Sequence, residues 1–217
     1  MCANALGITD LGHGGKIAAG FIAVISGYAA SYFTALCAAP KKRYSIIKST
    51  VIFIFVFYII VLVDFTLIDD NLGRNIFNIY NWNTTAFSDY INRNTNIVPF
   101  ATVRLFINAV KTSALPLYAV LENLLGNLAA FMPLPFFLAC LFKRFDNWYS
   151  VLITVLLSVI TVELLQLLFL TGSSDIDDVI LNTAGAMLLY GVLRIKGVSR
   201  FISKITFGVW ETENGKD

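Results

Sequence analysis

Long apolar runs are the feature that most constrains this chain. Several reach the roughly 20 residues that a helix needs to cross a hydrocarbon layer about 30 Å thick, where every backbone polar group must be paired internally. The composition agrees, because 57% of the 217 residues are hydrophobic, 14% are charged and the mean hydropathy is +0.73. We therefore predict an all-α integral membrane protein, a bundle of about five transmembrane helices forming one membrane domain over residues 1–217.

Polar stretches divide these apolar runs into segments. Two N-terminal helices are predicted within residues 17–68, followed by a polar loop over 69–115, three further helices and a polar tail over 194–217. The three later helices are expected at about 116–142, 148–170 and 178–193. Pro133 and Pro135 fall inside the first of these and should kink it, because proline removes a backbone donor.

The loop 69–115 contains apolar residues at helical spacing, with polar residues at the other positions. These apolar residues are Val103, Phe106, Ile107 and Val110. The pattern indicates a short amphipathic helix that lies along the membrane interface.

The basic residues predict the orientation, because Lys and Arg are retained on the cytoplasmic side of short loops. One side of the predicted bundle has Lys41, Lys42, Arg43, Lys48, Lys143, Arg144, Arg194, Lys196, Arg200, Lys204 and Lys216. The other side has Lys16, Arg74, Arg93, Arg104 and Lys111. The N-terminus is therefore predicted outside and the C-terminus in the cytoplasm, which makes the loop 69–115 extracytoplasmic.

Small residues recur every four positions in the first predicted helix. They are Ala19, Ala23, Gly27, Ser31 and Ala35. Such a stripe is typical of close helix packing, and we predict a contact within one chain, with a homodimer seam as the alternative.

Charge and residue usage exclude several classes of function. A net charge of +2 gives no indication of a nucleic-acid partner. His13 is the only histidine, so neither a histidine-based zinc site nor a serine-histidine triad can be built from this chain alone. We expect no cofactor.

Glu163 and Gln166 interrupt an otherwise apolar helix. A carboxylate at the centre of a membrane helix costs roughly 2.5–3.5 kcal/mol on insertion scales, and intramembrane ionisable groups are candidate functional residues. The two side chains share a helix face, with Glu163 about 12 Å below the outer end of the helix. Glu163 is the candidate for catalysis or for binding; a packing role is the alternative.

Asn123 and Asn127 lie four residues apart near the same outer end. Both amides can donate and accept hydrogen bonds. They are predicted to bind a polar group or, alternatively, to join helices.

An acidic turn, Asp175, Asp177 and Asp178, opens the last helix, with Asn182 one turn further in. Aspartates suit a helix N-terminus, yet three of them exceed what capping needs. We predict that they bind a substrate or a basic partner such as Arg93, Arg104 or Lys111. Ca²⁺ or Mg²⁺ is the alternative, although the spacing lacks the glycine and distal glutamate of an EF-hand.

In combination and order, these motifs resemble the VanZ-like family of bacterial membrane proteins, whose named members are accessory determinants of teicoplanin resistance. The resemblance covers residues 96–191, a core of three helices. Its parts are Asn96-Ile-Val-Pro99-Phe100, Asn123-Leu-Leu-Gly126-Asn127, Phe131-Met-Pro133-Leu134, Glu163-Leu-Leu-Gln166 and Asp175-Ile-Asp177-Asp178-Val-Ile-Leu-Asn182-Thr-Ala-Gly185. Pro135 stands where the family usually has glycine, and the turn 172–174 lacks an arginine that many relatives have.

The resemblance implies a protein of the bacterial plasma membrane with a role in the cell envelope. We expect an outward-facing pocket that engages a lipid headgroup, a lipid-linked wall precursor or a lipidated glycopeptide, formed by Asn123, Asn127, Glu163, Gln166, Asp175, Asp177, Asp178 and Asn182. Two alternatives stay open. One is an enzyme that modifies an envelope lipid through a carboxylate, although no nucleophile is identifiable; the other is a scaffold in which the polar residues fix helix packing.

Overall fold

The computed structural model describes residues 13–69, 74–142, 145 and 147–210. Its helices are α1 (His13–Cys37), α2 (Pro40–Val63), the π-helical turn η3 (Asp64–Ile68), the 3₁₀ turn η5 (Ile76–Asn81), α3 (Thr84–Asn94), α4 (Ala101–Lys111), α5 (Leu117–Ala130), α6 (Leu134–Leu141), α7 (Trp148–Leu168), α8 (Ile176–Leu193) and α9 (Lys196–Ile205). Two short strands, β1 (Thr95–Asn96) and β2 (Ser174–Asp175), pair in parallel.

Five segments of the described chain are long and apolar enough to cross a membrane. They are Gly20–Cys37, Pro40–Ile68, Leu117–Leu141, Trp148–Leu168 and Ile176–Leu193. The prediction of an all-α membrane bundle with about five spans is confirmed.

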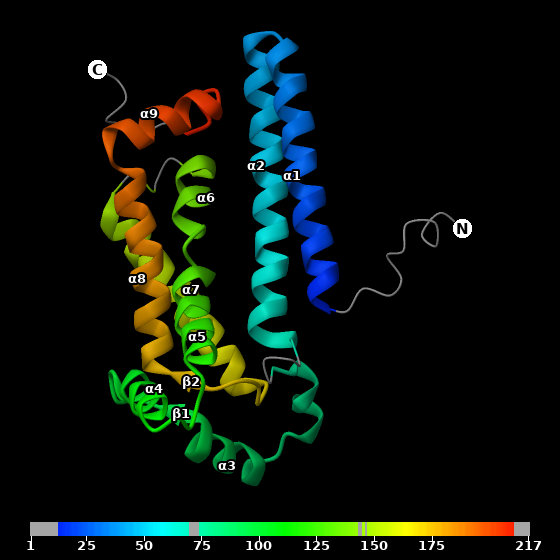
Figure 1. Ribbon diagram of the computed structural model, residues 1–217. Helices are drawn as coiled ribbons and strands as arrows, with labels where there is room; N and C mark the ends of the chain where they lie inside the picture. The colour runs from blue at the N-terminus through cyan, green and yellow to red at the C-terminus, as the bar shows by residue number, and fades with distance from the viewer. Residues whose placement is uncertain (1–12, 70–73, 143–144, 146, 211–217) are drawn as a thin grey trace.

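The spans form a hairpin of α1 and α2 beside a group made by α5, α6, α7 and α8 (Figure 1). α3 and α4 lie across one end of the bundle, and α9 lies across the other (Figure 1). The distribution of basic residues predicts that the α9 end is cytoplasmic and the α3/α4 end extracytoplasmic. The two ends are called the cytoplasmic and the extracytoplasmic end below, after this prediction.

The third span is divided into two helices. α5 ends at Ala130, and α6 begins at Leu134 directly after Pro133, the residue at its N-cap. The expected kink is therefore a break, because prolines at the start of α6 lack the N–H groups that would continue the helical ladder.

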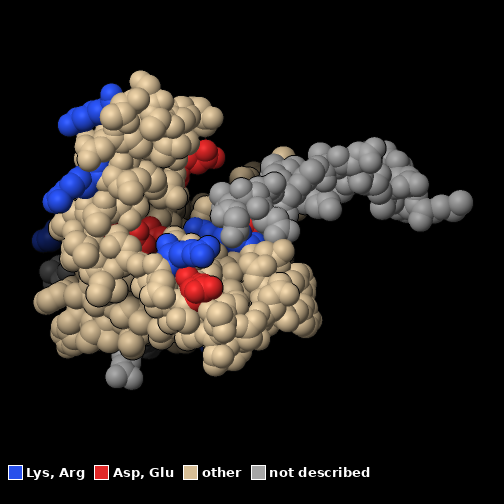
Figure 2. Space-filling view, turned by 90° about the horizontal axis from the view of Figure 1, so that it is seen from below, with Lys and Arg blue, Asp and Glu red and all other residues tan. Residues whose placement is uncertain are grey.

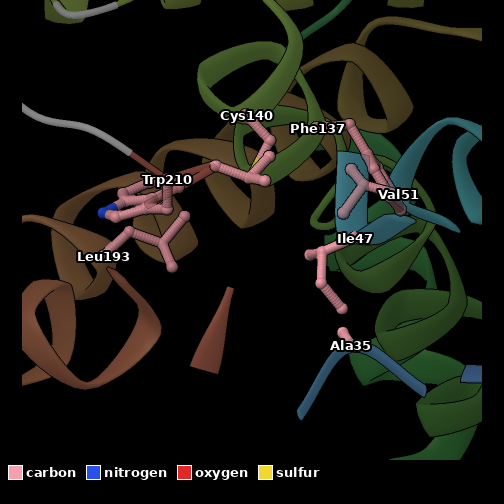
Figure 3. Close-up of a cluster of buried hydrophobic side chains, with 8 residues drawn as sticks. Ala35, Ile47, Val51, Phe137, Cys140, Leu193 and Trp210 are labelled. Carbon is pink, nitrogen blue, oxygen red and sulfur yellow. The ribbon is translucent and has the colours of Figure 1, made fainter. Parts of the chain in front are cut away.

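The cytoplasmic end has its own hydrophobic cluster, which joins α1, α2, α6, α8 and the segment after α9 (Figure 3). Trp210, only 2% exposed, stacks on Phe136 with ring centroids 5.8 Å apart. Its indole N–H donates to Ser199 Oγ of α9 at 3.1 Å. The tail predicted as polar is thus helical from Lys196 to Ile205, and α9 is fixed to the bundle.

A second cluster joins α2, α6, α7 and α8 with Phe131, the residue that follows α5. α7 contributes Val151, Val155 and Val159, four residues apart and at most 1% exposed. α8 meets α5 at Gly185, where a Cβ atom would lie 1.7 Å from the carbonyl oxygen of Leu128. Only glycine permits this approach of the two helices, which is how small residues act in membrane bundles.

We therefore predict that Gly185→Ala destabilises the protein by about 1–3 kcal/mol, the usual cost of overpacking, or prevents folding. The measurement is thermal unfolding in detergent. Gly191→Ala on the same helix is the matched control, because its Cβ would meet no atom within 4 Å. Equal unfolding temperatures for the two variants would contradict the close helix contact.

Candidate functional site

Two helices of the loop 69–115, η5 and α3, are hydrogen-bonded to the turn between α7 and α8. The Asn78 side chain donates to the carbonyl oxygen of Leu170 at 2.9 Å, and the Tyr90 hydroxyl donates to the carbonyl oxygen of Gly172 at 2.5 Å. Burial, and secondarily the charge of Glu163, raises the pKa of Tyr90 to about 12. The hydroxyl therefore remains a donor at physiological pH, and η5 and α3 stay docked on this turn.

The two strands bring the Asn96 motif against the acidic turn. Thr95 pairs with Ser174 and Asn96 pairs with Asp175. The Asn96 amide donates to Asp175 Oδ1 at 3.2 Å and to the Thr102 hydroxyl at 3.1 Å, and that hydroxyl donates to Asp175 Oδ2. Asp175 also caps α8, since its Oδ1 accepts from the backbone N–H of Asp177. Both carboxylate oxygens of Asp175 are thus occupied.

Asp177, 2% exposed, holds the N-terminus of α4. Its Oδ1 accepts from the N–H of Phe100, and its Oδ2 accepts from the N–H groups of Thr102 at 3.0 Å and Val103 at 3.2 Å. Phe100 has a φ of 62°, in the left-handed region that costs free energy for a residue with a side chain. The buried carboxylate offsets this cost because it satisfies donors that a helix N-terminus leaves unpaired.

Glu163 and Gln166 of α7 form hydrogen bonds with two different parts of the chain. Glu163 Oε2 accepts from the N–H of Asp175 at 3.1 Å, and the Gln166 amide donates to the carbonyl oxygen of Thr66 at 2.9 Å. That carbonyl is available because Thr66 lies in the π-helical turn η3, where the regular α-helical ladder is broken. Glu163 and Gln166 are 7% and 4% exposed.

Arg74 is the cation beside this group. Its Nη1 donates to the carbonyl oxygen of Phe65 at 2.6 Å, and its guanidinium lies 5.3 Å from the centre of the Phe65 ring. Burial lowers the pKa of Arg74 below its ordinary value, while the charges of Asp178, Glu163 and Asp69 act in the opposite direction. An arginine nevertheless stays protonated, so Arg74 supplies one positive charge where the turn 172–174 has none.

Asp178 joins α8 to α5. The Asn127 amide donates to Asp178 Oδ1, and Asn127 is 7% exposed. One turn later, the Asn182 amide nitrogen donates to the carbonyl oxygen of Asp178 at 2.8 Å. Asn182 Oδ1 is buried and has no hydrogen-bond partner among the residues that the structure describes.

These groups surround a small cavity of about 10 Å³, which is room for one water molecule. The cavity is lined by Phe65, Thr66, Arg74, Asn127, Ala130, Phe131, Val159, Val162, Glu163, Gln166, Asp178 and Asn182. Acidic and basic side chains gather near the middle of the extracytoplasmic face (Figure 2). The polar residues from η3, α5, α7 and α8 thus meet at one point near that face.

The structure separates the predicted site residues into two groups. Asn127, Glu163, Gln166, Asp178 and Asn182 line the cavity, whereas Asp175 and Asp177 bond to the α4 end of the loop. Asn123 is exposed on α5 and does not line the cavity. Within the described residues, no group of three or more His, Cys, Asp or Glu side chains is arranged to hold a metal ion.

The predicted basic partners of the aspartates lie elsewhere. Arg93, Arg104 and Lys111 are all exposed, and the partners of Asp177 are backbone N–H groups. Arg74 is the residue that sequence reasoning missed. Its only signal was a single arginine among the polar residues that follow the second span, and the sequence did not indicate that it would fold back onto that span.

Together, the fold and the site define a multi-pass membrane protein with a buried cluster of carboxylates and amides at one end of its helix bundle. The VanZ/LLP1 family model matches residues 55–197, more than half of the chain. The chain belongs to this family. No curated protein and no solved structure matches it significantly.

The capping role of Asp177 predicts a local effect. Asp177→Ala removes the acceptor for three N–H groups, so α4 should lose about 0.5–2 kcal/mol of stability, the usual cost of a lost N-cap. Hydrogen exchange of residues 100–105 in detergent is the measurement, and faster exchange is expected there. Asp89→Ala, at an exposed position on α3, is the control and should leave these rates unchanged; unchanged rates in both variants would refute the capping role.

Proposed function

We propose that this VanZ-like protein acts in the bacterial plasma membrane and contributes to teicoplanin and lipoglycopeptide resistance. It does so through a polar site facing outward, which engages a lipid headgroup, a lipid-linked wall precursor or the lipidated antibiotic. The observation that carries the proposal is the convergence of two carboxylates, a guanidinium and three amides on one cavity at the extracytoplasmic end.

Charge burial supports a ligand-binding role for this cavity. Ionisable groups at membrane depth are costly and are retained mainly where they contact a ligand, an ion or one another. Among the described residues that line the cavity, Arg74 is the one basic side chain beside Glu163 and Asp178. A ligand that donates hydrogen bonds would complete the compensation.

Each residue has a role in this proposal. Glu163 is the hydrogen-bonding anchor or proton acceptor, Asp178 binds the basic part of the ligand, and Asn127 orients Asp178. The cavity has room for one water molecule, so only the terminal group of a headgroup or peptide enters it.

A scaffold role is the second candidate, and it has support of its own. Asp175, Asp177 and Gln166 are occupied by hydrogen bonds within the chain, which suits residues that fix packing. In that case, substitutions in the cavity would lower activity only in proportion to the amount of folded protein.

The test expresses the chain and its Glu163→Gln variant in a sensitive bacterium and measures susceptibility to teicoplanin beside vancomycin. The wild type should raise teicoplanin resistance selectively, and Glu163→Gln should abolish that rise at equal membrane abundance. Glu122→Gln is the matched control, because Glu122 is exposed on α5 and does not line the cavity. Full resistance with Glu163→Gln, or the same loss with Glu122→Gln, would overturn the proposal.

A further inference from the structure

One acceptor atom in the cavity has no role in holding the fold. Asn182 is 5% exposed, and its amide nitrogen donates to the carbonyl oxygen one turn earlier. This bond fixes which end of the amide is nitrogen, because a carbonyl oxygen accepts only from a donor. Asn182 Oδ1 is then left buried and without a hydrogen-bond partner within the described chain. A buried unsatisfied acceptor costs about 1–3 kcal/mol. A ligand that donates a hydrogen bond to this oxygen would remove that cost.

Two carboxylates, Glu163 and Asp178, line the cavity with Asn182. Glu163 Oε2 accepts from the N–H of Asp175, and Asp178 Oδ1 accepts from the Asn127 amide; each carboxylate oxygen can accept more than one hydrogen bond. The nearby amides and the guanidinium each donate to another group, Gln166 to Thr66, Asn127 to Asp178 and Arg74 to Phe65. Asn182 Oδ1 thus lacks a donor within the described chain, and two carboxylates that can accept further hydrogen bonds line the same cavity.

The charges point to the same kind of ligand. Two carboxylates face one guanidinium in the cavity, and that guanidinium donates to the carbonyl oxygen of Phe65. The neighbouring Asp175 and Asp177 are each bonded to the N-terminus of a helix, where a negative charge is favourable. One further positive charge would balance the cavity.

We propose that Glu163, Asp178 and Asn182 bind a primary ammonium group. Such a group has three N–H donors and no acceptor, its charge balances the second carboxylate, and its size is close to that of the water molecule for which the cavity has room. A trimethylated ammonium has no N–H and is too large. The inference rests on the proposed function and names the ligand chemistry of that site: an amine on a phospholipid headgroup or on a soluble peptide.

The experiment measures thermal unfolding of the purified full chain in detergent. Methylammonium chloride should raise the unfolding temperature more than tetramethylammonium chloride at equal ionic strength. Phosphatidylethanolamine added to the micelles should likewise stabilise more than phosphatidylcholine if the amine is on a lipid. A preference for methylammonium without a preference for phosphatidylethanolamine supports the ammonium site and assigns it to a soluble amine.

Variants test which residues hold the ion. Asp178→Asn and Asn182→Ala should each abolish the preference for methylammonium. Thr183→Ala is the matched control and should keep the preference. It also removes from α8 a buried oxygen that has no hydrogen-bond partner within the described chain, but Thr183 does not line the cavity. If Asn182→Ala does not fold, the isosteric Asp178→Asn decides the question.

Three results would overturn the proposal. Equal stabilisation of the wild type by methylammonium and tetramethylammonium means that the cavity does not recognise the N–H groups of an ammonium ion. Equal stabilisation by sodium chloride and methylammonium chloride means that the site takes an inorganic cation. Preference retained in Asp178→Asn places the ion elsewhere. None of these results affects the resistance assay, which tests Glu163 whatever its ligand. If Glu163→Gln keeps full teicoplanin resistance while the methylammonium preference of the wild type is intact, the proposed function alone is refuted.

Discussion

Compensation of buried carboxylates is the constraint on which the extracytoplasmic half of this protein depends. Glu163, Asp175 and Asp177 are at most 7% exposed, and a charge leaves water only when hydrogen bonds or opposite charge replace its hydration. Asp177 obtains this from the N-terminus of α4, Asp175 from Asn96 and Thr102, and Glu163 from a backbone N–H. The loop 69–115 is therefore part of the polar site: its docking on α8 and the burial of the carboxylates require each other.

Much of the fold was predictable from the sequence because it follows from the length and the periodicity of the apolar segments. The five spans, the amphipathic α4 and the break at Pro133 follow from apolar runs and proline chemistry. Helical spacing also placed Glu163 with Gln166 on one face, and both line the cavity. α9 has a pattern of the same kind, Val198, Phe201, Ile202 and Ile205 among basic residues, and a search of the tail for helical spacing would have found it.

Tertiary pairing could not be read from the chain. Asn123 and Asn127 have equivalent sequence signals, yet Asn127 is buried and donates to Asp178 of α8, whereas Asn123 is exposed. Arg74 reaches the cavity through a fold back onto the π-helical turn, which no local pattern specifies. Asp175, Asp177 and Asp178 form one acidic run, but the directions of their side chains divide them between loop docking and the cavity.

The most direct measurement of charge compensation is a double-mutant cycle on Arg74 and Asp178, read as the free energy of unfolding in detergent. Arg74→Gln leaves two carboxylates at the cavity without their cation, and Asp178→Asn added to it removes one of these charges. The account predicts a coupling of about 0.5–3 kcal/mol, with the double variant less destabilised than the sum of the single variants. Additivity within about 0.5 kcal/mol would show that the two charges do not compensate each other and would contradict the account.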